Sequence, residues 1–553
     1  IFQDTNDWQR GFESYQKALS LYQKNKNRGM EALVWRYIGH IYRSQKKYEN
    51  ALDAYEKSKN IFIELNNEIG IAWVISDIGW LQSDQEFWAQ AIDAHQNSIV
   101  IFEKLGLKSE TASMLTNIAT TYKLAYNFNK AIEYYEKAIE LFDIIKDSEK
   151  KSWTLNRLGF LESERENWDT AINYHFQALS IFEEPKNLSG QAGAWFSLGL
   201  TYQQARLWKE AKDAYEKSRG IFVTLGNKIS EASIINSLGL LEAAQDHWDQ
   251  ALEYYNQALD YINEFDHKNF RATILFNIGR TLKGALRWKD AEYNFKKSQD
   301  LFREIGDRQG VAWRFDDLGD LEINQEHWQE ALKYYQSAIA SFEELVEQSA
   351  LASVWCDIGY AHQKAKHWEE AKRSFDLAYA IYTRSGDKKS QINIKYHLGR
   401  LELEQEHWIK SRQYFQQGLG SINNFGTPTV RSKFLKQIGW AYMGAKQWLR
   451  AEKAFNQALT IYRNINHKQN EAWIINDLGQ LEFNQENWDK ALELYMTALE
   501  IFQVEGNRSA QAWILDYIGL TYAYSKQWVN AENSYKKSLD LFHELNDQRN
   551  VAW

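Results

Sequence analysis

A glycine recurs every 40 residues along this chain of 553 residues. Nine residues after each of 13 equivalent positions stands an aromatic residue, which is tryptophan in 11 cases, and alanine follows three residues later in 12 cases. Self-similarity at one fixed period of this length is the signature of a solenoid, in which each unit packs only on its neighbours. The sequence therefore predicts a single repeat array over residues 1–553, with about 13 repeats. The glycines are Gly39, Gly79, Gly159, Gly199, Gly239, Gly279, Gly319, Gly359, Gly399, Gly439, Gly479 and Gly519, and Ala119 fills the remaining position.

Each repeat has the apolar spacing of two helices. In the segment 191–226, apolar and small residues recur at three- and four-residue intervals on both sides of a break at 205–207. Such spacing predicts two amphipathic helices of about 15 residues each, and no stretch shows the alternation of a strand, so we predict an all-α fold. Glycines at the ends of several repeats are expected to close the second helix in the left-handed conformation. These are Gly106, Gly226, Gly306, Gly386 and Gly506.

The recurring small residues predict close packing of the two helices. Gly199 and Ala211 lie on the faces that meet, and a glycine inside a helix costs about 0.5–1 kcal/mol relative to alanine, so its regular reappearance implies a packing reason. Trp208 is expected to fill the wedge beside these two residues. A buried tryptophan covers about 150–250 Å², and we interpret the whole 40-residue tryptophan ladder as core and not as a ligand site.

Composition excludes several classes of partner. The chain has 74 acidic and 65 basic residues and a net charge of -9, and without basic runs this balance argues against nucleic acid. No apolar run approaches the roughly 18 residues of a membrane span, and no secretory leader opens the chain. Cys356 is the single cysteine, which rules out internal disulfides and fits a cytoplasmic protein. The oligomeric state is left open.

Enzyme signatures are missing from the sequence, so we predict no catalytic residues, no metal and no cofactor. Phosphate-binding loops, zinc-protease pairs, nucleophile elbows and paired cysteines are all absent. Four histidines directly precede the repeat tryptophan, but residues 40 positions apart on stacked helices lie roughly 10 Å from one another, too far to share one metal. We interpret them as polar residues of the turn between the helices. They are His247, His327, His367 and His407.

The pattern of one repeat resembles the tetratricopeptide repeat family. The bulky residue, Leu-Gly, Tyr, Ala, aromatic residue and Ala of that family are matched by Trp195, Leu198, Gly199, Tyr202, Ala211, Tyr215 and, in place of the last alanine, Ser218. The chain departs from the family in its 40-residue period, against about 34, and in Val223 where a proline usually closes the repeat. The residue pattern of the 40-residue repeat is similar to that of the arrays in kinesin light chains, in Leu-Gly-Asn polarity adaptors and in sensor regions of bacterial signalling ATPases of the STAND type. The resemblance implies a right-handed superhelical α-solenoid whose first helices line a concave groove.

A second period of 80 residues overlies the first. Three residues after the glycine, odd repeats carry tyrosine at most positions, whereas even repeats carry Gln82 or a glutamate. Seven residues after it, odd repeats are mostly basic and even repeats are acidic. Because stacking places equivalent positions side by side, we interpret the alternating sign as a device that avoids a column of like charges.

By the geometry of the resembled family, four positions of the first helix face the groove. Aromatic residues flanked by Asp, Asn and Ser suit a peptide, since rings anchor apolar side chains while carboxylates and amides bind its backbone or its cations. The alternative is that these rings only pack one repeat on the next. The lysine and asparagine clamp that some family members use for C-terminal carboxylates is absent, with only Lys433 and Lys436 as a partial match. The candidate groove residues are Trp73, Ser76, Asp77, Trp80, Trp153, Phe160, Trp313, Asp316, Asp317, Asp357, Tyr360, Trp440, Trp473, Asn476, Asp477, Trp513 and Asp516.

Three functions fit these observations. The first is an interaction or ligand-sensing array that binds a protein or peptide in its groove, as part of a larger multidomain signalling protein. The second is a passive scaffold, and the third is the regulatory segment of an enzyme whose catalytic domain lies elsewhere. The array starts and stops inside repeats, at Trp8 and at residues 551–553, and we expect it to be a fragment of a longer protein.

Overall fold

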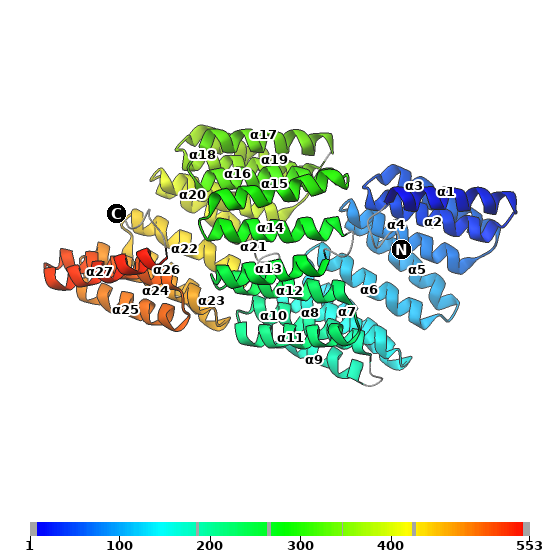
Figure 1. The fold of residues 1–553 in the computed structure, drawn as a ribbon, viewed down its shortest axis with the longest axis horizontal. Helices are drawn as coiled ribbons and strands as arrows, with labels where there is room; N and C mark the ends of the chain where they lie inside the picture. Colours follow the sequence, from blue (N-terminus) through cyan, green and yellow to red (C-terminus); the bar gives the residue numbers. More distant parts are fainter. Residues whose placement is uncertain (1–7, 184–186, 263–266, 346, 423–426, 546–553) are drawn as a thin grey trace. The chain divides into compact units, whose positions relative to one another are not determined.

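The computed structural model describes residues 8–183, 187–262, 267–345, 347–422 and 427–545 (Figure 1). Within these ranges the chain forms twenty-seven α-helices and no strand, which confirms the predicted all-α solenoid. Even-numbered helices are the first helices of the repeats and odd-numbered helices are the second. The side chain of Trp8 and residues 551–553, on which the expectation of a longer protein rests, lie outside the described part.

The chain divides into two compact units, residues 1–227 and 228–553. The first unit contains one leading helix and five helix pairs among its described residues. Its helices are α1 (Trp8–Lys24), α2 (Arg28–Ser44), α3 (Tyr48–Glu64), α4 (Glu68–Asp84), α5 (Trp88–Lys104), α6 (Lys108–Leu124), α7 (Phe128–Ile144), α8 (Ser148–Glu164), α9 (Trp168–Glu183), α10 (Leu188–Gln204) and α11 (Trp208–Thr224).

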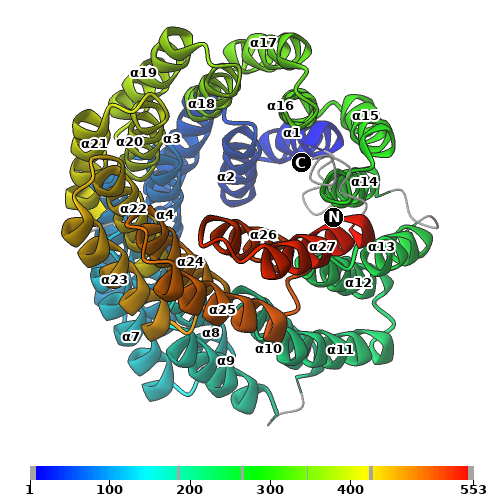
Figure 2. The ribbon, with the colours of Figure 1, turned by 90° about the vertical axis from the view of Figure 1, so that its left-hand side faces the viewer.

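The second unit contains eight helix pairs in its described residues. Figure 2 shows that, within this unit, first helices such as α14, α16 and α18 lie on the inner side of the curve and α15, α17 and α19 on its outer side. The helices are α12 (Lys228–Ala243), α13 (Trp248–Ile262), α14 (Lys268–Gly284), α15 (Trp288–Glu304), α16 (Arg308–Asn324), α17 (Trp328–Glu344), α18 (Gln348–Lys364), α19 (Trp368–Arg384), α20 (Lys388–Glu404), α21 (Trp408–Ile422), α22 (Pro428–Gly444), α23 (Trp448–Asn464), α24 (Lys468–Asn484), α25 (Trp488–Val504), α26 (Arg508–Tyr524) and α27 (Trp528–Glu544).

Left-handed residues separate the helices. The five glycines predicted to close second helices all have positive φ, between 65° and 75°, as expected for a residue without Cβ. After the first helices the same conformation is taken by residues with side chains, such as Glu86 with φ of 63° and Leu286 with φ of 59°. The position seven residues after the recurrent glycine, where basic and acidic residues alternate, is this turn residue. The sequence pattern alone did not reveal that the residue at this position must adopt the left-handed conformation.

The recurrent glycine makes room for an aromatic ring sixteen residues later. A Cβ added to Gly199 would lie 2.5 Å from Tyr215 Cδ1, and one added to Gly319 would lie 2.6 Å from Tyr335 Cε1. Both tyrosines are fully buried. The prediction of close packing at Gly199 is therefore confirmed, but the ring in the wedge is Tyr215 and not Trp208.

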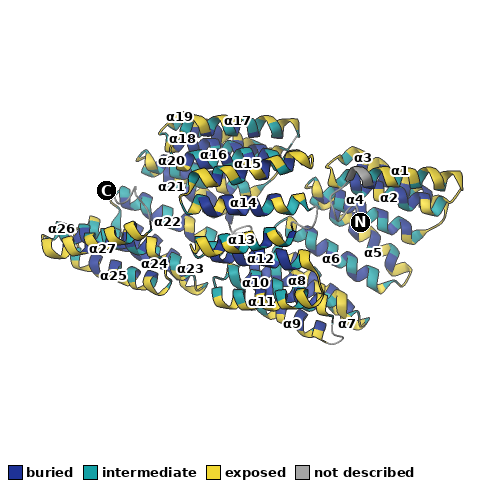
Figure 3. Ribbon diagram, viewed as in Figure 1, coloured by how far each residue is buried: buried dark blue, intermediate teal, exposed yellow. Residues whose placement is uncertain are grey.

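The tryptophan ladder packs on the following repeat. The Trp248 ring lies against Gly284 of the next first helix, and Trp408 lies against Gly444 in the same way. Both rings are half-buried. Four equivalent tryptophans, also half-buried, contact core clusters, so the prediction of a packing role holds and that of a buried core position is wrong. The four are Trp288, Trp328, Trp368 and Trp448. Trp528, on the last helix, is 66% exposed. Figure 3 shows buried residues on the faces where helices meet and exposed ones on the outer faces.

Candidate binding surface on the first helices

Successive first helices touch along one face. The residue three before the glycine contacts the residue two before the next glycine, 41 positions later. In the first unit Asn117 Nδ2 donates to Ser76 Oγ at 3.3 Å, and in the second unit Asn277 Nδ2 donates to Asn236 Oδ1 at 2.9 Å. This face carries the positions predicted to line the groove.

The five tryptophans at the first predicted position share one packing arrangement. Each indole meets a phenylalanine of the second helix in its own pair at a steep angle, with centroids 4.9–5.4 Å apart. Trp153 is 43% exposed and Trp513 is 38% exposed, and the other three are half-buried. One edge of each ring is therefore anchored while part of its surface stays accessible. The pairs are Trp73–Phe102, Trp153–Phe182, Trp313–Phe342, Trp473–Phe502 and Trp513–Phe542.

The second aromatic set lies one residue after the glycine and is half-buried throughout. Trp80 packs on buried His95 and Phe160 on buried His175, at 5.3 and 5.0 Å between centroids. Tyr360 carries the Lys364 ammonium over its ring at 5.3 Å. Trp440 meets Phe455 at 6.4 Å.

Four of the predicted polar residues lie inside the protein. Ser76, Asp77, Asn476 and Asp477 are all buried. Asp77 accepts hydrogen bonds from the Arg36 guanidinium, and the Asp477 carboxylate lies 3.2 Å from Lys436 Nζ. Burial raises the pKa of Asp477 to about 6, against the opposing charge of Lys436.

Four predicted aspartates remain half-buried on the same face. Asp317 lies 2.7 Å from Arg314 Nη2, and burial raises its pKa to about 6. Burial also raises the pKa of Asp516. The pKa values of Asp316 and Asp357 are raised well above the usual range, first by burial and then by neighbouring aspartates. The structure thus brings Asp316, Asp317 and Asp357 together in the second unit, while Asp516 lies apart from them.

The glutamates three residues after the glycine in even repeats contact the residue that precedes the repeat tryptophan, in the turn between the two helices. The sequence interpretation missed this role. His247 Nδ1 lies 2.9 Å from Glu242 Oε2, and Asn487 Nδ2 donates to Glu482 Oε2 at 2.7 Å. The same contact recurs at His327 and His407, so these histidines are turn residues as predicted. No group of three His, Cys, Asp or Glu side chains in the described ranges could hold a metal ion.

A cleft of about 1000 Å³ that is lined by α13, α14 and α15 was also missed. Its floor consists of leucine and isoleucine side chains of α14, and α13 and α15 form its walls. Arg271 is exposed at its rim, and Lys297 lies over the Tyr293 ring at 4.4 Å.

The family model of the tetratricopeptide repeat matches seven segments, which together cover more than half of the chain. The chain belongs to the tetratricopeptide repeat family. Arrays of this family are protein-interaction modules that bind through their extended surfaces. In the part of this array that the structure describes, no helix combines the length and apolar content needed to cross a membrane. The matched segments are 30–104, 71–144, 110–184, 190–264, 270–344, 433–503 and 470–544.

Solved structures resemble this tetratricopeptide array only distantly. A Rap protein complexed with Competence and Sporulation Factor is 12% identical over 72% of this chain and 99% of its own, with a TM-score of 0.39. Aspartyl phosphate phosphatase F from Bacillus subtilis is 13% identical over 64% and 95%, with a TM-score of 0.42. BtubC (BKLC) from P. vanneervenii is 15% identical over 43% and 92%, with a TM-score of 0.33. No curated protein sequence matches the chain.

Proposed function

We propose that the first-helix face of this array binds a peptide segment of a partner protein. The observation that carries the proposal is the set of anchored but accessible tryptophans on the first helices of each unit, of which Trp153 in the first unit and Trp513 in the second are the most exposed. An aromatic ring whose edge is fixed by packing loses little conformational entropy on binding, so it provides an efficient apolar anchor. The half-buried aspartates beside the rings supply acceptors for peptide N–H groups or cations.

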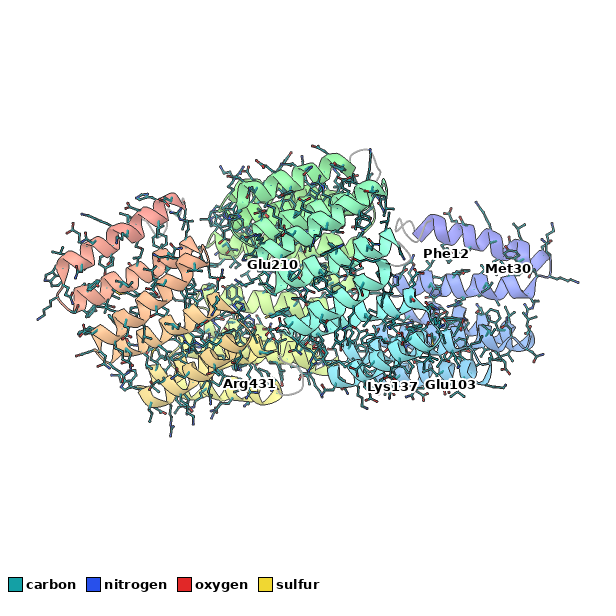
Figure 4. The ribbon with its side chains drawn as sticks, turned by 90° about the horizontal axis from the view of Figure 1, so that it is seen from below. Phe12, Met30, Glu103, Lys137, Glu210 and Arg431 are labelled. Carbon is teal, nitrogen blue, oxygen red and sulfur yellow. The ribbon has the colours of Figure 1, made fainter. Side chains whose placement is uncertain are left out.

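The passive scaffold is less well supported. Trp153 also lies against Gly193 of the next first helix. Tryptophans that served only to join repeats would be buried between them, whereas these rings also pack on their own second helix and keep part of their surface open. Charged side chains such as Glu103 and Lys137 cover the outer helices of the first unit (Figure 4), and exposed charges of this kind usually remain solvated.

We extend the proposal to a sensing role within a larger multidomain signalling protein. The resemblance of the repeat phrasing to sensor arrays of signalling ATPases supports this extension. A repeat array suits such a role because each repeat contacts only its neighbours, so a ligand that spans several repeats changes their stacking.

Two tryptophan variants test the binding proposal. W153A and W513A remove exposed inner rings, and W528A removes the 66% exposed tryptophan of α27 as the control. We expect partner capture from the source cell extract to fall about tenfold or more for the first two variants, the usual loss for an aromatic hot spot. Capture by W528A should equal that of the parent.

Circular dichroism on all three variants establishes that they are folded. Equal capture by the parent and by folded W153A and W513A would contradict groove binding. Loss of partner capture with W528A alone would indicate that the partner binds the outer helices.

A further inference from the structure

The contacts between neighbouring first helices are chemically complementary in five places. Each joins a residue three before one glycine to the residue two before the next, and each pairs a donor with an acceptor or a cation with an anion. The pairs are Arg36–Asp77, Ser76–Asn117, Asn236–Asn277, Tyr396–Gln437 and Lys436–Asp477. The same register, between α16 and α18, places Asp316 beside Asp357.

The cations nearest to this pair are engaged by other aspartates. Arg314 Nη2 lies 2.7 Å from Asp317 Oδ2, and Lys283 Nζ lies 3.6 Å from Asp320 Oδ2. Asp316 Oδ1 is buried and has no hydrogen-bond partner among the described residues. Burial raises the pKa of both Asp316 and Asp357; neighbouring aspartates raise it further, Asp320 and Asp317 for Asp316, and first of all Asp316 for Asp357.

Two neighbouring carboxylates at a packed interface repel each other unless one of them binds a proton or a cation joins them. Both residues are half-buried, so part of each remains exposed although Asp316 Oδ1 itself is covered. Trp313 and Tyr360 stand three residues from the two aspartates on the same helices, where side chains three apart are neighbours. A guanidinium group donates to two carboxylates in a fixed plane and stacks on aromatic faces, which an ammonium group does less well.

We propose that Asp316 and Asp357 form an acidic pocket that binds the guanidinium group of an arginine in the bound peptide. This inference rests on the proposed function and names the chemistry of one of its anchors. A metal ion is the less suitable occupant, since the described residues provide no group of three ligands. The Arg36–Asp77 contact of the first unit shows the same chemistry satisfied from within the protein.

The test compares the full chain with the isosteric variant D316N/D357N. A random peptide library displayed on phage is selected on each, and on the control D260N/D540N, whose aspartates are exposed on second helices. We expect arginine to be enriched in peptides selected by the parent and the control but not in those selected by D316N/D357N. Replacing that arginine by neutral citrulline in a selected peptide should weaken binding to the parent about 10- to 100-fold and leave binding to D316N/D357N unchanged.

The outcomes separate this inference from the proposed function. The acidic pocket is refuted if the parent selects peptides without any preference for arginine. It is also refuted if citrulline weakens binding to D316N/D357N as much as to the parent. Neither result contradicts peptide binding to the first-helix face. A library from which the parent selects no peptide would contradict both. Folding of the variant is followed by its unfolding midpoint, which should equal or exceed that of the parent because a like-charge pair has been removed.

Discussion

At the residue scale, equivalent positions of the repeats take different roles because their neighbours differ. Asp77 and Asp317 occupy the same position, yet Asp77 is buried against Arg36, while the residue in the place of Arg36 one repeat before Asp317 is Phe276. Asp317 is consequently held by Arg314 of its own helix. The period identifies equivalent residues but not their partners, so the sequence predicted the groove positions without predicting which carboxylates stay accessible.

The recurrent glycine gives the first residue-scale prediction. In G199A the new Cβ would lie 2.5 Å from the ring of buried Tyr215, so we expect a loss of about 1–3 kcal/mol in the free energy of unfolding. The control is G220A in α11, where a Cβ meets nothing within 4 Å and a gain of about 0.5–1 kcal/mol is expected. Urea denaturation of both variants checks this, and equal effects would refute the close-packing explanation.

Buried histidines give the second residue-scale prediction. Burial lowers the pKa of His95 and of His175 from 6.5 to about 4. Between pH 6.5 and 4 the unfolded chain binds protons that the folded chain does not, so stability is complete above pH 6.5 and falls as the pH decreases through this window. The slope is at most about 1.4 kcal/mol per pH unit for each histidine.

The variant H95F/H175F tests the origin of that slope. Phe295 and Phe375 occupy the equivalent position in other repeats, so the ring is accommodated. We expect the variant to lose the part of the decline in unfolding midpoint between pH 6.5 and 4 that these two histidines cause, while His397, whose pKa burial also lowers to about 4, keeps its share. An unchanged decline would assign the acid sensitivity to other groups.

At the element scale, the helix pair was predictable because its signals are local. The break at 205–207 lies between α10, which ends at Gln204, and α11, which begins at Trp208. The helices are 17 residues long, two more than expected, because the turn needs only three residues. What the spacing could not show is that a left-handed residue follows every first helix.

That turn gives a prediction for Leu286. Its φ of 59° brings a Cβ into the left-handed region, which costs about 1–2 kcal/mol for a residue with a side chain. L286G should therefore raise the free energy of unfolding by up to about 1 kcal/mol after the greater entropy of glycine in the unfolded chain is counted. L286A keeps the Cβ and should bring no gain. A gain in L286A equal to that in L286G would contradict the role of backbone strain.

At the scale of the whole molecule, the 40-residue period predicted the solenoid and the number of helix pairs, because stacking repeats is the only way each unit buries both faces. The division into residues 1–227 and 228–553 could not be predicted from the sequence, because the 40-residue period continues across it unchanged. The single array, its place in a longer protein and its cytoplasmic location remain predictions. The partner also remains unpredicted, since its identity depends on inner side chains that vary from repeat to repeat.

Site-specific photocrosslinking tests the central claim, that the first-helix face binds the partner. Benzoylphenylalanine replaces Trp440, which is half-buried on α22, or, as the control, Leu449, which is 80% exposed on α23 of the same helix pair. We expect covalent capture of the partner from position 440 and none from position 449. Capture from position 449 alone would place the partner on the outer helices and contradict the groove.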